Sequence, residues 1–196
     1  RDEARQASEE ALALARTGGD VATEAMVRND LGVTADEAGD PDAAIAHYEQ
    51  ALAGHRRIGD RRNEGGTLVN IAYVALMLGR HEGAARGFEQ ALALFRRIGM
   101  RQNEGITLVN LAMTELQQGR AEAAHDHAAM AASLLKAVRD RWAEAAARRV
   151  RGQAAHALGR IEDAQRELDA ACAMFECMGL VGSSLEARCG LAEVTL

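Results

Sequence analysis

The chain has 196 residues, of which 48% are hydrophobic and 27% are charged, so it can bury a sizeable core. Its formal net charge of −6 argues against direct binding to nucleic acid or to an anionic membrane surface. No apolar run approaches the roughly 18 residues needed to cross a bilayer, and no signal-peptide pattern opens the chain, so we expect a cytoplasmic protein.

The cysteines and the basic residues indicate the setting. Cys172, Cys177 and Cys189 all lie in the last quarter, and an odd number in one region makes a poor disulfide framework, so we expect free thiols. Lys136 is the only lysine, and alanine is abundant, which favours a GC-rich, bacterial coding sequence. Because the chain opens with Arg1 inside a repeat, we expect it to be a piece of a longer protein.

The N-terminal stretch predicts helices with defined ends. Asp2–Arg16 has apolar residues at helical spacing and is followed by a Thr-Gly-Gly turn that reaches Gly19. Asp20 can cap a second helix that runs to about residue 38, and Gly39 follows, where a left-handed residue commonly ends a helix. Pro41 then falls in the first turn of a third helix, where its missing N–H costs nothing.

The rest of the chain repeats this arrangement every 40 residues. The segment Asn63–Asn70 recurs almost unchanged as Asn103–Asn110, and glycines recur in two columns in which only Arg139 breaks the pattern. Such periodicity marks a solenoid or array. We therefore predict about ten helices and no strand, arranged as half-repeats and four helix pairs. The predicted divisions are 1–20, 21–60, 61–100, 101–140, 141–180 and 181–196, all within one array.

Within each unit, small and large residues follow one order. In the second unit they are Leu68, Ile71, Ala72, Ala75, Gly79, Ala84, Phe88, Ala91 and Leu92. This order resembles the tetratricopeptide repeat family, with a period of 40 in place of about 34, as in kinesin light chains and many bacterial signalling proteins. The resemblance implies an all-α protein, an α-α superhelix (TPR solenoid) with four full helix pairs and a half-repeat at each end.

Two features bear on that assignment. A HEAT-like array also fits the period, but small residues at Ala72 and Ala84 and a recurring Gly-x-x-x-x-Ala turn favour the tetratricopeptide pattern. Arg151 departs from the pattern, because it occupies a position that holds Leu31 and Ile71 in earlier units. We therefore expect the packing of the fourth unit to differ.

Stacked helix pairs place a concave groove along their first helices, and binding is expected there. One stripe of each first helix, at i, i+3, i+4, i+7 spacing, faces this groove. The predicted groove residues are Met26, Asn29, Asp30 and Val33; Gly66, Val69, Asn70, Tyr73 and Met77; Ile106, Val109, Asn110, Met113 and Gln117; and Arg149, Val150 and Gln153. The groove residues predict binding of a protein or peptide.

The column Asp30, Asn70, Asn110 is the sharpest signal in this stripe. A carboxamide offers donors and an acceptor, so each Asn can bond the backbone of an extended peptide. The Asn before the Leu/Ile-Ala step resembles the peptide-gripping asparagines of kinesin light chain and bacterial peptide-sensor tetratricopeptide domains. Asp30, when ionised, can only accept. The alternative is that each Asn satisfies a neighbouring helix.

Other constellations are weaker. Arg148, Arg149 and Arg151 either hold a ligand carboxylate or form an exposed, solvated charged face. His125-x-His127 looks like a metal pair, but side chains at i and i+2 of a helix point apart, so we expect no metal site.

The remaining signals describe the class of protein. Trp142 is expected to serve in packing. No catalytic set and no cofactor motif emerges, so we expect a non-enzymatic protein without cofactors. The competing roles are a peptide-binding scaffold, a sensor or oligomerisation module of a bacterial transcription regulator with a possible homo-oligomer, and a structural spacer. The composition and long repeat resemble the C-terminal parts of large actinobacterial regulators.

Overall fold

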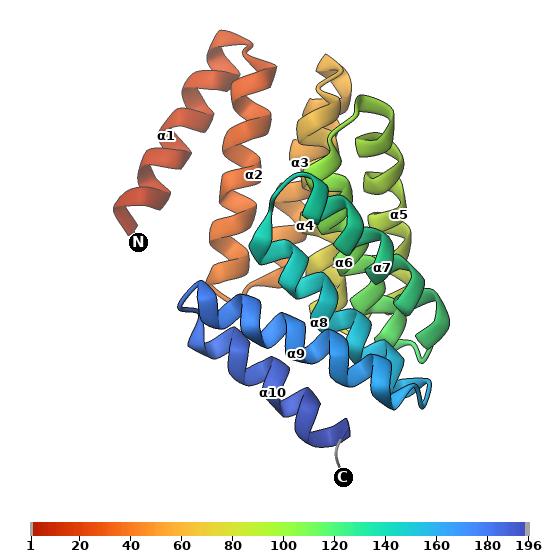
Figure 1. Ribbon diagram of the computed structural model, residues 1–196. Coiled ribbons are helices and arrows are strands. Elements are labelled where there is room, and N and C mark those ends of the chain that lie inside the picture. Colours follow the sequence, from red (N-terminus) through yellow and green to blue (C-terminus); the bar gives the residue numbers. More distant parts are fainter. Residues whose placement is uncertain (1, 195–196) are drawn as a thin grey trace. The chain divides into compact units, whose positions relative to one another are not determined.

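The computed structural model describes residues 2–194, with side chains described for residues 10–188 and for residue 190, and this part contains ten α-helices and no strand (Figure 1). The helices are α1 (Asp2–Gly18), α2 (Val21–Glu37), α3 (Pro41–Ile58), α4 (Arg61–Met77), α5 (His81–Ile98), α6 (Arg101–Gln117), α7 (Ala121–Ala137), α8 (Arg141–Ala157), α9 (Ile161–Cys177) and α10 (Val181–Val194). The predicted all-α solenoid of four helix pairs with a helix at each end is confirmed. The side chain of Cys189 lies outside the described residues.

Short aspartate-containing turns start several helices. The carboxylates of Asp20, Asp40, Asp60 and Asp140 each accept a hydrogen bond from the backbone N–H three residues later, and Pro41 occupies the first turn of α3. These bonds satisfy N–H groups that have no partner within the helix. The N–H of Asn63 lowers the pKa of Asp60 for the same reason, because it favours the charged carboxylate.

Left-handed residues end the helices at regular intervals. Gly39, Gly59 and Gly79 have φ values of 78°, 75° and 69°, and glycines at 19, 99, 119, 159 and 179 adopt the same conformation. Arg139 occupies this place with φ of 61°, the only non-glycine residue with positive φ in the described part of the chain. A side chain with a Cβ is disfavoured there, so the turn geometry is set by the repeat even where the sequence departs from glycine.

The chain forms two compact units, which we describe separately. The first unit is Arg1–Ile98, in which α2 packs on α3, α3 on α4 and α4 on α5. Its core contains Tyr48 and Phe88, both with almost no exposed surface. Gly32 packs against Tyr48 so closely that an added Cβ would lie 2.6 Å from the ring. Small residues on one helix therefore make room for aromatic rings on its partner.

The second unit is Gly99–Leu196, in which each helix from α6 to α10 packs on the next, and α6 also packs on α8. Its core is richer in alanine, and Leu108, Leu135 and Leu168 are fully buried. Gly152 lies against Leu168, where an added Cβ would come within 2.7 Å. None of the described helices in either unit is long and apolar enough to cross a membrane.

Candidate functional site

The first helices α2 and α4 present a mixed polar and apolar surface. Met26, Tyr73 and Met77 are 49%, 43% and 68% exposed, Asp30 is exposed, and Val69 is half-buried. Exposed methionine and tyrosine side chains offer apolar area that can adapt to a ligand. This surface is therefore suited to contact a partner.

A pocket of about 330 Å³ opens between α2 and α4, and we call it the first-unit pocket. Most of its lining residues have polar side chains, and the lining includes Met26, Asn29, Asp30, His55, Asn63, Gly66, Thr67 and Asn70. On α4 the lining residues recur at positions 63, 66, 67 and 70, which is one face of a helix. Five of the predicted groove residues thus line one pocket: Met26, Asn29, Asp30, Gly66 and Asn70.

Three side chains in this pocket form a hydrogen-bonded group, which we call the amide cluster: Asn29, Thr67 and Asn70. The Thr67 hydroxyl donates to Oδ1 of Asn29, and Nδ2 of Asn70 donates to the same oxygen, both at 3.2 Å. Thr67 is buried, while the two asparagines are half-buried. Asn70 therefore bonds a neighbouring helix, as the alternative interpretation expected, and it also lines a pocket.

The charge of the first-unit pocket comes from Asp30. The imidazole of His55 is almost fully buried, and burial lowers its pKa, so it is neutral at pH 7. Asn63 is half-buried, and its side chain donates to Asp60 at 2.7 Å. The pocket thus combines amide groups with one exposed carboxylate.

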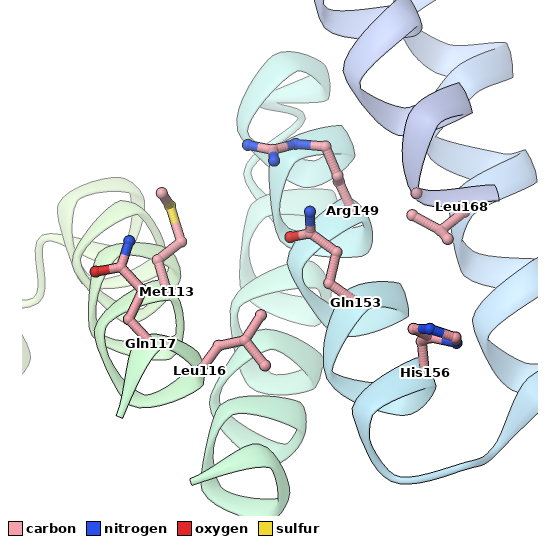
Figure 2. Close-up of a pocket in the computed structure, with 8 residues that line it drawn as sticks. Met113, Leu116, Gln117, Arg149, Gln153, His156 and Leu168 are labelled. Carbon is pink, nitrogen blue, oxygen red and sulfur yellow. The ribbon is translucent and has the colours of Figure 1, made fainter. Parts of the chain in front are cut away.

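A second pocket, of about 410 Å³, lies in the second unit, and we call it the second-unit pocket. Its lining is Met113, Leu116, Gln117, Arg149, Gln153, His156, Leu168 and Gly190 (Figure 2). The side chains of Arg149 and Gln153 project from neighbouring turns of α8 (Figure 2). The Arg149 side chain is 19% exposed and lies 3.9 Å from Glu186. This pocket therefore carries a cation, in contrast to the first-unit pocket.

The amide cluster has counterparts two repeats later. The same repeat positions in the second unit hold Val109, Ala147 and Val150, and we call these the valine cluster. All three are buried. Val109 was expected to line the groove, but it is only 6% exposed, because its position lies where α6 packs on α8. Asn110, Ile106 and Met113 are half-buried, and Gln117 is exposed.

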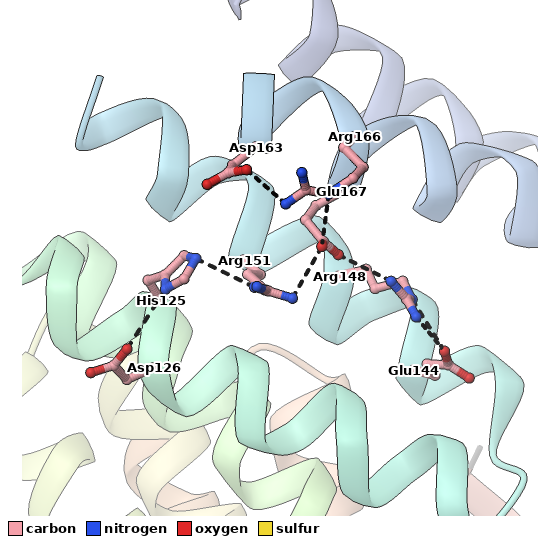
Figure 3. A network of polar contacts seen from close by, with 8 residues as sticks. All are labelled: His125, Asp126, Glu144, Arg148, Arg151, Asp163, Arg166 and Glu167. Carbon is pink, nitrogen blue, oxygen red and sulfur yellow. Dashed lines mark hydrogen bonds and ion pairs between the residues drawn. The ribbon is translucent and has the colours of Figure 1, made fainter. Parts of the chain in front are cut away.

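The arginines of α8 do not form an exposed charged face, and that interpretation was wrong for two of them. Arg148 donates to Glu144 and to Glu167 at 3.0 and 3.1 Å, and Arg151 donates to Glu167 at 3.0 Å. Nε of Arg151 also donates to Nε2 of His125 at 3.3 Å. We call these five residues the arginine network (Figure 3). Because Glu144 and Glu167 are buried, the network neutralises charge inside the second unit.

The structure also shows the surroundings of His125, His127 and Trp142. His125 meets Arg151, whereas Nδ1 of His127 lies 2.8 Å from Glu115, so the two rings serve different neighbours. Among the described residues, no three acidic, histidine or cysteine side chains gather in a way that could hold a metal ion. Trp142 is 54% exposed, so the expectation that it serves in packing was wrong.

Sequence reasoning missed two sets of contacts. It placed Asn29 on the predicted face but did not pair it with Asn70. The signal that could have indicated this pair is their separation of 41 residues, which is one 40-residue repeat plus one residue. It also missed that Arg56 on α3 reaches the buried Glu64 on α4 at 3.1 Å, as Arg16 reaches Glu24 at 3.2 Å. Both carboxylates follow their arginine by eight residues.

Comparisons with known proteins agree with this geometry. The profile of the tetratricopeptide repeat matches residues 1–57 and 64–137, more than half of the chain. No curated protein matches. Several solved structures are similar. One is a signal transduction ATPase with numerous domains (STAND) with a tetratricopeptide repeat sensor from Pyrococcus horikoshii, at 18% identity and a TM-score of 0.86, over 97% of this chain and 30% of that one.

Two further structures have the same fold. BtubC (BKLC) from P. vanneervenii is 19% identical with a TM-score of 0.77, over 99% of this chain and 87% of that one. A Rap protein complexed with competence and sporulation factor is 18% identical with a TM-score of 0.75, over 88% of this chain and 48% of that one. This chain therefore spans less than a third of the Pyrococcus protein and about half of the Rap protein. On its sequence profile and its helix pairs, the chain belongs to the tetratricopeptide repeat family.

Proposed function

We propose that this chain binds an extended peptide or protein segment along its first helices. Tetratricopeptide repeat proteins act as protein-interaction modules, on a repeat scaffold that typically carries no catalytic function. The observation that carries the proposal is the amide cluster, which places carboxamides of two adjacent first helices in one pocket. An enzymatic role for this chain is not proposed.

The contacts that a ligand would make differ between the units. In the first unit, Asn70 offers a carboxamide, Asp30 offers a carboxylate to a ligand N–H or cation, and Met26, Tyr73 and Met77 offer apolar area. In the second unit, Ile106, Asn110 and Met113 occupy the corresponding positions of α6, and Arg149 and Gln153 can hold an acidic or polar ligand group. The proposal treats residues 1–196 as one functional array.

The Rap protein supports this proposal, since its solved structure holds competence and sporulation factor. At 18% identity the likeness concerns the fold, so the support is that this fold can accommodate such a partner. Cytoplasmic location and bacterial origin stay predictions from composition.

The test uses an array of end-blocked octapeptides of random sequence. A peptide that the wild-type chain binds is then titrated against Asn70→Ala by fluorescence anisotropy. Loss of one or two hydrogen bonds, each worth about 0.5–1.5 kcal/mol, with a ligand group left unpaired, raises Kd about tenfold. Gln90→Ala, an exposed residue of the second helix α5, is the matched control and leaves Kd unchanged. No bound peptide, or equal affinity for Asn70→Ala, contradicts the proposal.

A second candidate is a sensor module within a signalling or transcription regulator. The STAND protein from Pyrococcus horikoshii favours it, because 97% of this chain aligns with that protein, which carries a tetratricopeptide repeat sensor. For this role, ligand binding must change an output, such as the oligomeric state. Light scattering of the chain with and without the selected octapeptide tests it, and an unchanged mass contradicts an oligomerisation switch.

A further inference from the structure

The hydrogen bonds of the amide cluster all converge on one atom. Oδ1 of Asn29 accepts from the Thr67 hydroxyl and from Nδ2 of Asn70, both at 3.2 Å. Within the described part of the chain, Oδ1 of Asn70 and Nδ2 of Asn29 take part in no hydrogen bond. Oδ1 of Asn29 thus accepts two hydrogen bonds, while Oδ1 of Asn70 can still accept a bond and Nδ2 of Asn29 can still donate one to an added molecule.

This bonding fixes the direction of the Asn70 carboxamide. The amide is planar, with its oxygen and nitrogen on opposite sides of the Cγ atom, so holding Nδ2 at Asn29 fixes where Oδ1 lies. Without Asn29, either end of the Asn70 amide can turn toward the pocket. Asn29 therefore selects the orientation in which Asn70 presents an acceptor.

Packing alone does not require these polar groups. The valine cluster fills the same repeat positions in the second unit with three buried apolar side chains. In the second unit, α6 and α8 therefore pack at these positions without an amide. Polar groups that are dispensable for packing, and that retain unused hydrogen-bonding capacity beside a pocket, are characteristic of a binding site.

We propose that Asn29 is a positioning residue that orients Asn70 to accept a hydrogen bond from one amide N–H of the ligand. This inference rests on the proposed function, and it names the group that the first-unit pocket recognises. Asn29 lines the same pocket, and its Nδ2 can donate to the oxygen of that amide. An acceptor beside a donor complements a single amide group.

Two sources supply such an amide. One is a peptide bond of the ligand backbone, and the other is the side chain of an Asn or Gln. A backbone source makes binding tolerant of sequence, whereas a side-chain source demands Asn or Gln at one ligand position. Ester analogues distinguish them, because replacing one backbone N–H by oxygen removes a donor and keeps the side chains.

The experiment compares the wild-type chain with Asn29→Val, which introduces the residue of the valine cluster. The probe is the octapeptide selected on the array, together with its seven single-ester analogues. For the wild type, one ester raises Kd about tenfold. Asn29→Val raises Kd for the parent peptide about tenfold and raises Kd for that ester by a smaller factor, because the bond from the ligand N–H to Asn70 is already absent and only the contact of Asn29 with the carbonyl oxygen remains to be lost. If no ester matters and replacing one Asn or Gln of the peptide gives this pattern, the amide comes from a side chain.

The controls separate positioning from a general structural effect. Thr34→Val alters an exposed hydroxyl of α2 that bonds its own helix at 2.9 Å, and Kd stays unchanged. Circular dichroism verifies folding, and Asn29→Ala gives a second variant at the same position. An Asn29→Val chain that binds the parent as tightly as wild type overturns the inference alone. Weakening of the parent and every analogue by the same factor also overturns it, whereas a wild-type chain that binds no peptide overturns the proposed function as well.

Discussion

The two units join adjacent first helices with opposite chemistry: α2 and α4 are linked by hydrogen bonds, whereas α6 and α8 pack directly on one another. The first unit uses the amide cluster, and the second uses the valine cluster at the same repeat positions. Both units keep regular helix pairs. The repeat therefore does not fix whether the residues at these positions are polar or apolar, and the polar residues of the first unit are available for recognition.

Where a first helix packs on the second helix of its own pair, the first unit is apolar and the second unit is charged. Leu68 and Ile71 of α4 occupy the repeat positions at which α8 has Arg148 and Arg151. The two arginines meet Glu167 of α9, which is buried. Arg148 and Arg151 are thus paired within the protein, whereas Asn29 and Asn70 of the amide cluster each keep a group that can form a further hydrogen bond.

The largest expected effect concerns the aromatic core of the first unit. Phe88 is fully buried, and its repeat position holds Ala128 and Leu168 in the second unit. Phe88→Ala should lower the free energy of unfolding by about 3–5 kcal/mol, because the alanine leaves a cavity. Phe88→Leu, the control, should lose about 1 kcal/mol. Urea denaturation measures both, and equal losses would contradict a role for the ring volume.

The next effect tests the arginine network. Glu167→Gln leaves two arginines without their shared carboxylate and should lower the free energy of unfolding by about 2–3 kcal/mol, a value reduced because both arginines remain partly solvated. Removing all four charges, as Arg148→Leu and Arg151→Ile (the residues of the first unit) with Glu144→Gln and Glu167→Gln, should restore stability to within about 1 kcal/mol of wild type, because no buried carboxylate is left unpaired. A quadruple variant less stable than Glu167→Gln would show that the second unit requires the charges.

A smaller effect is expected for the ion pairs that Glu64 forms with Arg56 and Arg61. Burial acts to raise the pKa of Glu64, but hydrogen bonds from Arg61 and Arg56 outweigh it and hold that pKa below its usual value. The carboxylate therefore stabilises the fold above its unfolded-state pKa of about 4.3, and this contribution is lost as pH falls through the folded-state pKa.

Glu64→Gln should consequently cost about 1 kcal/mol at pH 7, since both arginines are about half exposed, and the difference from wild type should shrink below pH ~4.3. Thermal unfolding across pH measures it. The exposed pair of Glu82 and Arg86, 3.8 Å apart, supplies the control, because Glu82→Gln should change little at any pH. A difference that grows on acidification would contradict this account.

The smallest effect concerns the helix-ending turns. Arg139 holds φ of 61° where Gly59 of the first unit has 75°. Arg139→Gly should change the free energy of unfolding by up to about 1 kcal/mol in the stabilising direction, because glycine adopts this conformation without steric cost. Gly59→Arg should destabilise by a similar amount. If both substitutions destabilise, the Arg139 side chain has contacts that outweigh its backbone strain.

Much of this fold could be predicted from the sequence, because the signals are local and repeated. Asp20, Pro41 and the glycine columns mark helix ends, and the 40-residue period marks the pairs. Contacts between helices were harder to predict. The pairing of Asn29 with Asn70 depends on a one-residue stagger between α2 and α4, which periodicity alone does not reveal. Charge alone could not show whether Arg151 faces solvent or a carboxylate.

The central claim is that the first unit keeps its amide cluster for recognition and not for stability. The most direct measurement is the free energy of unfolding of the double variant Asn29→Val, Asn70→Val, which recreates the valine pair of the second unit. We expect a value equal to or above that of the wild type, because apolar burial offsets the lost hydrogen bonds, each worth about 0.5–1.5 kcal/mol. A loss of about 2 kcal/mol or more would show that the cluster holds the first unit together and would contradict the claim.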